Sequence, residues 1–107
     1  PFTALLNCTN GEVKSHSFFK ERWPELRCEL STLMQAAGYP RSELEIEHTV
    51  FEVMEKTENN ISSMLQDLRV KRPTEIDDIN GFASSFLKSK NLSFTINHQL
   101  WQAVLKL

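Results

Sequence analysis

A hydroxyl and a carboxylate in the middle of the chain are the side chains best suited to bind a polar ligand. Ser63 lies early in one amphipathic helical pattern, and Glu75 lies at the start of the next. Because Pro73 and the residue before it disfavour helix, the first helix must end before Pro73. If the short link from Val70 to Arg72 folds the two helices side by side, the hydroxyl and the carboxylate converge on one groove. From these residues alone, an ordinary early-helix serine and a first-turn glutamate are the simpler explanation.

Capping signals predict where these two helices begin. Asn59 or Asn60 can cap the first helix. Thr74 and Asp77 form a capping box for the second, in which the Thr74 hydroxyl accepts from the amide of Asp77 and the Asp77 carboxylate reaches back. The second pattern contains Gly81, and an interior glycine costs about 1 kcal/mol relative to alanine. We therefore expect a close neighbour against this glycine, either another helix or a ligand, with helix packing the simpler of the two.

Other reactive residue types have a structural explanation. Glu45 and His48 have the Glu-x-x-His spacing of carboxylate-bridged metal bundles, but such a site needs a second copy and two further glutamates. The sequence has no second copy, so we expect no metal site. The histidines, His16, His48 and His98, have no hydroxyl or thiol at a spacing that predicts a nucleophile and its base. The chain also has no glycine-rich phosphate loop.

Helical periodicity recurs along the whole chain and predicts an all-α fold of five or six helices. The expected helices run over Pro1–Leu6, from Ser15 or Ser17 to Ala37, from Ser42 to Lys56 or Thr57, from Asn59 or Asn60 to before Pro73, from Thr74 to about Lys90, and from about Ile96 onward. The expected apolar faces hold Phe19, Trp23, Leu26, Leu30, Leu33, Met34, Ala37, Ile46, Val50, Phe51, Val53, Met54, Met64, Leu65, Leu68, Ile76, Ile79, Phe82, Ala83, Phe86, Leu87, Ile96, Leu100, Trp101, Val104 and Leu105. Pro24 falls inside the second helix and predicts a kink or a fresh start there.

Length and charge narrow the class of protein. A chain of 107 residues is one domain by length and can bury about two-thirds of its unfolded surface. With 12 basic and 14 acidic residues, its net charge of −2 gives no electrostatic reason to expect nucleic acid or a membrane surface as partner. No apolar run approaches the roughly 20 residues of a membrane span. We expect a cytoplasmic protein.

Two segments carry a resemblance to a known family. From Ser62 to Gly81 the chain reads SSMLQDLRVKRPTEIDDING, which closely resembles the C-terminal signature of ketopantoate reductases, NADPH-dependent enzymes of pantothenate synthesis that reduce 2-dehydropantoate. The opening PFTALLNCTNGEV is similar to the stretch that follows the family's catalytic-lysine helix. Together the segments anchor a resemblance over nearly all residues, and it implies a helical C-terminal domain of the 6-phosphogluconate dehydrogenase-like type.

The resemblance implies roles for three residues. Ser63 matches the serine that binds the substrate carboxylate, and Asn10 matches an asparagine on the substrate side. Glu75 matches the glutamate that contacts the ribose of NADPH and helps to order the catalytic lysine. From spacing alone, Asn10 in the pair Asn10-Gly11 reads as a turn residue. The family usually has prolines where this chain has Leu92-Ser93-Phe94-Thr95, which leaves the geometry of that loop open.

The resemblance also implies that part of the enzyme lies elsewhere. The family's general-acid lysine precedes the position of Pro1, and its glycine-rich Rossmann domain lies further upstream. We therefore expect residues 1–107 to be a C-terminal domain without a catalytic residue of its own, inactive alone. Its partners would be the N-terminal Rossmann domain in cis and a 2-oxo acid substrate, with a homodimer as a further possibility.

Two alternatives remain open from the sequence. The first keeps the fold and changes the substrate to another 2-oxo acid. The second is a secreted helical binding protein with a Cys8–Cys28 disulfide and glycans at the Asn-x-Ser/Thr triplets beginning at Asn7, Asn60 and Asn91.

Overall fold

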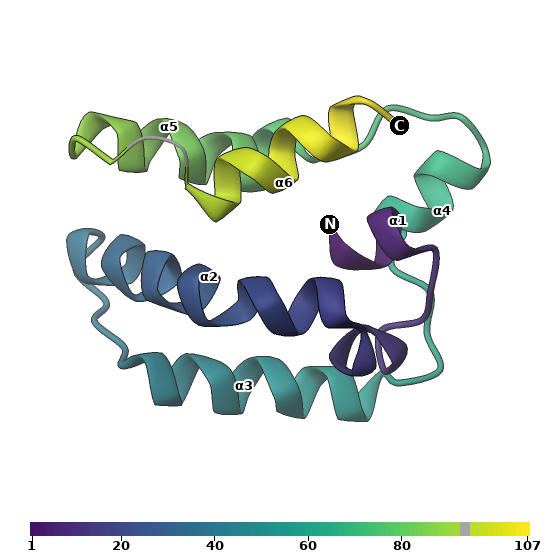
Figure 1. The fold of residues 1–107 in the computed structure, drawn as a ribbon, viewed down its shortest axis with the longest axis horizontal. Helices are drawn as coiled ribbons and strands as arrows, with labels where there is room; N and C mark the ends of the chain where they lie inside the picture. Colours follow the sequence, from purple (N-terminus) through teal and green to yellow (C-terminus); the bar gives the residue numbers. More distant parts are fainter. Residues whose placement is uncertain (93–94) are drawn as a thin grey trace.

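The computed structural model describes residues 1–92 and 95–107, and every regular element in those ranges is helical (Figure 1). The elements in chain order are α1 (Phe2–Leu6), the 3-10 turn η1 (Glu12–Ser15), α2 (Ser17–Ala36), α3 (Glu43–Lys56), α4 (Ser63–Arg69), the π-helical turn η2 (Asp77–Gly81), α5 (Phe82–Ser89) and α6 (Ile96–Leu105). The all-α prediction is confirmed. Ser93 and Phe94, which belong to the loop and the third Asn-x-Ser triplet noted above, lie outside the described residues.

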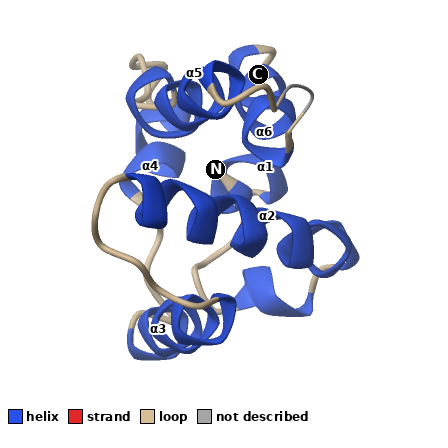
Figure 2. Ribbon diagram, turned by 90° about the vertical axis from the view of Figure 1, so that its left-hand side faces the viewer, coloured by secondary structure: helices blue, strands red, loops and turns tan. Residues whose placement is uncertain are grey.

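The long helix α2 organises the domain. Both views place it between α3 on one side and the pair α5 and α6 on the other, with α1 and α4 beside each other at one end in Figure 1 (Figures 1 and 2). The helix runs without a break through Pro24, so it has no fresh start there. Phe19 and Trp23 stack with their ring centroids 5.4 Å apart, and Phe51 of α3 packs against both rings. This aromatic contact joins α2 to α3.

Two helix starts follow local signals in the sequence. Ser42 caps α3, its hydroxyl accepting from the amide of Glu45 at 3.1 Å, as the Ser-x-x-Glu pattern predicts. Thr95 caps α6 by accepting from the amide of His98 at 3.1 Å. Such caps satisfy amides that have no partner inside the helix.

Some expected core positions are wrong. Val53 and Leu105 are 54% and 52% exposed, because α3 packs chiefly on α2 and Leu105 lies at the end of its helix. Ile79 and Phe82 are 48% and 64% exposed for another reason. Gly81 donates to the carbonyl of Ile76, five residues back, so the turn η2 holds one more residue than an α-helical turn. The buried residues here, Ile76, Asn80, Ala83 and Leu87, recur at three- and four-residue intervals, so the packed face is centred on them and Ile79 and Phe82 lie to one side of it.

Candidate functional site

Ser63 and Glu75 meet at one small surface depression. Met64, Asp67 and Ile79 complete its lining, and its volume is about 30 Å³. Ser63 is the first residue of α4, and Glu75 lies just before η2. Both side chains are exposed. The structure thus brings together, across the proline-containing link, the hydroxyl and the carboxylate that the sequence singled out.

A serine pair sets the start of α4 and with it the place of Ser63. Ser62, not Asn59 or Asn60, caps the helix, and its hydroxyl accepts from the amide of Leu65 at 3.2 Å. The predicted cap was wrong because Asn60 is still in the preceding turn, where its amide donates to the carbonyl of Thr57. The hydroxyl of Thr3 in α1 bonds to the hydroxyl of Ser62, so α1 holds this helix start from the side.

A close backbone contact fixes the segment that leads into α4. The amides of Asn10 and Gly11 donate to the carbonyls of Asn60 and Glu58 at 2.9 and 3.0 Å. A Cβ at position 11 would lie 2.6 Å from the Cβ of Glu58, so only glycine allows these two segments to approach. Gly11 therefore helps to position Ser63 by allowing the segment before α4 to approach the turn at Asn10.

Asn10 is not at the depression. Its side-chain amide donates to the hydroxyl of Thr57 at 3.0 Å, tying the turn to the end of α3. It lines a separate cavity of about 190 Å³, together with residues of α1 and α3 that include Phe2 and Met54. The structure therefore does not bring Asn10 together with Ser63 and Glu75.

The link between the two site residues closes through a tight turn. Lys71 adopts a left-handed backbone conformation with φ of 59°, and the amide of Arg72 donates to the carbonyl of Asp67 at 2.8 Å. The guanidinium of Arg72 also lies 3.4 Å from the Asp67 carboxylate, which lines the depression. This turn reverses the chain so that Glu75 returns beside α4.

The capping box predicted at Thr74 is wrong. The Thr74 hydroxyl accepts from the amide of Ile76 at 3.4 Å, two residues on, rather than from Asp77. The Asp77 carboxylate instead accepts from the indole N–H of Trp101 at 2.7 Å. The carbonyl of Glu75 accepts from the amides of Asp78 and Ile79 at 3.0 and 3.1 Å. Glu75 therefore enters a π-helical turn and not an α-helix, which is why the capping pattern misleads.

One pairing of reactive types was missed. The Ser84 hydroxyl and Nδ1 of His98 lie 3.2 Å apart, because α5 packs against α6. No spacing in the sequence signals this contact, which depends on how the two helices meet. Ser84 is 7% exposed, and the rings of His98 and Trp101 lie 5.9 Å apart in a T-shaped arrangement, so the pair is part of the helix contact.

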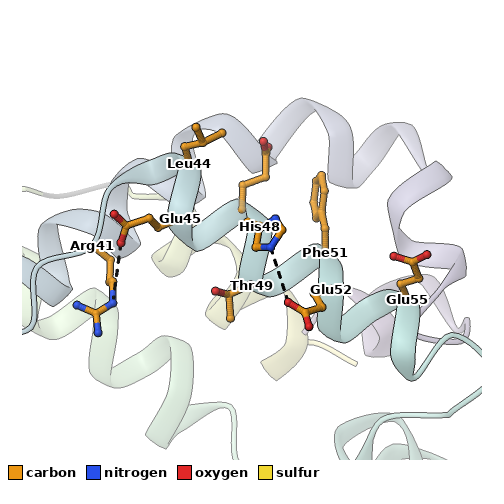
Figure 3. Close-up of a pocket in the computed structure, with 9 residues that line it drawn as sticks. Arg41, Leu44, Glu45, His48, Thr49, Phe51, Glu52 and Glu55 are labelled. Carbon is orange, nitrogen blue, oxygen red and sulfur yellow. Dashed lines mark ion pairs between the residues drawn. The ribbon is translucent and has the colours of Figure 1, made fainter.

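A larger hollow runs along α3 (Figure 3), and neither Ser63 nor Glu75 lines it. Its volume is about 1020 Å³, and charged side chains line it. Figure 3 shows His48 turned toward Glu52 and Arg41 toward Glu45, at 3.8 and 4.0 Å. Across residues 1–92 and 95–107, no three His, Cys, Asp or Glu side chains are grouped to hold a metal ion. Glu45 lies in the first turn of α3, where a carboxylate stabilises the helix, and Glu52 pairs with Lys56 at 2.7 Å.

Comparison with known proteins identifies the family. Residues 1–107 match the family described as ketopantoate reductase PanE/ApbA C terminal. The chain belongs to this family. Family membership confirms the resemblance in the Ser62–Gly81 segment and agrees with the helical fold. Cys8 and Cys28 are both free thiols in the structure, so the disulfide of the secreted alternative is not formed.

Three curated relatives, each named 2-dehydropantoate 2-reductase, are similar over almost the whole chain. The proteins of Shigella flexneri and Salmonella typhimurium are 35% and 36% identical over 104 residues, which are 97% of this chain and 33% of each relative. The protein of Pyrococcus horikoshii is 31% identical over 107 residues, covering 97% of this chain and 34% of the relative. The chain therefore spans about a third of the length of these ketopantoate reductases. In the part that the structure describes, no helix has the length and apolar character to span a membrane.

Proposed function

We propose that this chain is the C-terminal domain of a cytoplasmic, NADPH-dependent reductase that converts 2-dehydropantoate to pantoate in pantothenate synthesis. The observation that carries the proposal is the depression shared by Ser63 and Glu75. These residues come from two different elements, and the Ser62 cap and the Lys71 turn hold them in place. A site placed on fixed elements is what positioning of a substrate requires.

Each side chain has a defined part in this proposal. The Ser63 hydroxyl donates to the substrate carboxylate, and the exposed Glu75 carboxylate accepts from hydroxyls of the cofactor ribose and orders a lysine of the upstream domain. Asn10 keeps the substrate-side role that the resemblance implies, although its amide bonds to Thr57 here.

The residues present fit one edge of the cofactor. The depression of about 30 Å³ is far smaller than a dinucleotide, and the chain has no glycine-rich loop for the pyrophosphate. A carboxylate suits ribose hydroxyls and not phosphates, so Glu75 matches the sugar. When bound, the cofactor supplies the hydride, and this domain positions the groups around it.

The missing wall of the cleft is a nucleotide-binding domain joined to this one in cis. Ile79, which lines the depression, is exposed, and so is Phe82, three residues further on at the start of α5. Exposed apolar groups beside a polar site are typical of a surface that another domain covers.

A second substrate class has support from the same site. A serine hydroxyl recognises the carboxylate that all 2-oxo acids share, so Ser63 does not by itself select 2-dehydropantoate. Assays of the full-length protein with a panel of 2-oxo acids decide between these substrates.

The test is kinetic and uses the full-length protein that carries this domain. Ser63→Ala is expected to raise KM for the 2-oxo acid about tenfold or more, because a hydrogen bond to a charged group contributes about 1.5–3 kcal/mol. Glu75→Ala is expected to lower kcat strongly and to raise KM for NADPH. Ser85→Ala, at an exposed serine of α5, is the control. Unchanged kinetics in both site variants would refute the proposal.

A further inference from the structure

Helix α6 holds the π-helical turn η2 at two points. The side-chain oxygen of Asn97 accepts from the side-chain amide of Asn80 at 2.8 Å, and the indole N–H of Trp101 donates to Asp77 at 2.7 Å. Asn97 and Trp101 lie about one helical turn apart and so face the same way. We refer to these two residues of α6 as the clamp.

The indole of Trp101 lies directly on the backbone of the turn. A Cβ at Gly81 would be 3.0 Å from both Cε2 and Nε1 of Trp101. Gly81 has an ordinary helical φ of −62°, so it is present for this close approach rather than for backbone freedom. Since Asp77 and Gly81 are the first and last residues of η2, the ring spans the whole turn.

Asn97, the other residue of the clamp, is held by hydrogen bonds to α2. The Glu29 carboxylate of α2 accepts from the backbone amides of Ile96 and Asn97 at 2.7 and 3.0 Å, and from the Asn97 side-chain amide at 2.8 Å. This fixes the Asn97 amide group so that its oxygen faces Asn80. Asn97 and Asn80 are 2% and 5% exposed, so their bond is shielded from water.

The position of η2 bears directly on the depression. Glu75 immediately precedes the turn and its carbonyl accepts from two amides there, while Ile79 of the turn lines the depression. A π-helical turn is rare and is commonly found at functional sites. If it relaxed to an α-helical turn, one residue would leave the helix and Glu75 would shift relative to Ser63.

We propose that Asn97 and Trp101 are positioning residues, which keep η2 π-helical and thereby set Glu75 and Ile79 against Ser63. The catalytic consequence rests on the proposed function, whereas the structural part does not. Neither residue touches the depression, so each acts through the turn.

The chain offers a matched control for Trp101. Trp23 also donates its indole N–H to a carboxylate, that of Glu47, at 2.7 Å, but it joins α2 to α3. Trp101→Phe and Trp23→Phe therefore remove the same chemical bond in two places. Both variants are made in the full-length protein, and hydrogen exchange is measured at the amides of Ile79 and Gly81, with steady-state kinetics beside it.

The expected results differ between the two variants. Trp101→Phe speeds exchange at both amides about tenfold or more, raises KM for NADPH and lowers kcat. Trp23→Phe lowers Tm but leaves exchange at these amides and KM unchanged. Exchange at Ile79 and Gly81 that stays at the wild-type rate in Trp101→Phe overturns the proposal, as does an equal response to Trp23→Phe.

Variants of Asp77 test whether the bond itself matters. Asp77→Asn keeps an oxygen that accepts from the indole and is expected to exchange nearly as the wild type does. Asp77→Ala is expected to match Trp101→Phe, and the double variant to be no worse than either single one, since the two side chains act as one unit. Additive effects in the double variant contradict the clamp.

The two proposals fail separately because exchange needs no turnover. If the full-length wild-type protein reduces no 2-oxo acid, the proposed function is refuted. The hydrogen-exchange rates still show whether the clamp holds η2. Fast exchange in Trp101→Phe with normal kinetics defeats the positioning role of the clamp.

Discussion

At the scale of single residues, two tryptophans each donate a hydrogen bond to a carboxylate. Trp23 donates to Glu47 and Trp101 donates to Asp77, each at 2.7 Å. Trp23 is 6% exposed, so its indole N–H needs a partner, and in both pairs the carboxylate is a stronger acceptor than a neutral oxygen. In both pairs the partners lie 24 residues apart in sequence, so neither bond could be read from a local pattern.

The Glu47 pair predicts a pH effect on stability. The indole N–H of Trp23, with Arg27 beside it, lowers the pKa of Glu47 below its ordinary value. A carboxyl whose pKa is lower in the folded state stabilises the fold above its unfolded-state pKa, and this contribution is lost as the pH falls through the folded-state pKa. Glu47→Gln should therefore lower Tm at pH 7 and lose its difference from wild type as the pH falls through the lowered folded-state pKa of Glu47.

Thermal unfolding at pH 7 and in acid measures this effect. Glu55→Gln, which changes an exposed glutamate of the same helix, is the control for the general effect of removing a charge. A Tm difference for Glu47→Gln that is the same at both pH values would show that the carboxylate does not act through its charge.

At the scale of elements, local signals predicted α3 well and η2 badly. The Ser42 hydroxyl caps α3 by accepting from the amide of Glu45, so residues 42–45 alone predict where this helix begins. The turn η2 depends on contacts from α6 that are distant in sequence, and the apolar pattern placed Ile79 and Phe82 inside, whereas the structure buries the polar Asn80 and Ser84. The sequence did predict a close neighbour against Gly81, and Trp101 is that neighbour.

Gly81→Ala is a sharp test of this element. At an open interior position of a helix the change would stabilise by about 1 kcal/mol through helix propensity. Here the new Cβ would lie 3.0 Å from Trp101, so the indole must move away from Asp77. We expect a net loss of about 1–3 kcal/mol, the usual cost of overpacking. Urea unfolding gives the sign, and a more stable variant would mean that the ring moves freely.

At the scale of the whole molecule, the sequence predicted the fold class and the convergence of Ser63 with Glu75. The convergence followed from Pro73, which forces a bend between two helices. The placement of Asn10 did not follow, since its amide bonds to Thr57 at the far end of α3, and that contact depends on how distant segments meet. The roles of these residues came from family resemblance, because hydroxyl, amide and carboxylate groups recur throughout the chain.

The surface of the domain predicts which side another domain covers. Phe82 and Leu44 are 64% and 74% exposed, and Figure 1 places α5, which begins at Phe82, across α2 from α3, which carries Leu44. If the nucleotide-binding domain covers the depression, Phe82 is buried in the full-length protein and Leu44 stays exposed. Phe82→Ser should then lower kcat/KM of the full-length protein about tenfold, given the roughly 1.5–3 kcal/mol of a buried phenylalanine.

Leu44→Ser is the matched control and should leave kcat/KM unchanged, because α3 lies away from the depression. Hydrogen exchange along η2 and α5, compared between the full-length protein and residues 1–107, checks burial independently of turnover. Slower exchange there in the full-length protein is the expected result. If exchange is instead slower along α3 in the full-length protein, the interface lies on the face that carries Leu44. Two copies of the protein that pair through this face would give the same result.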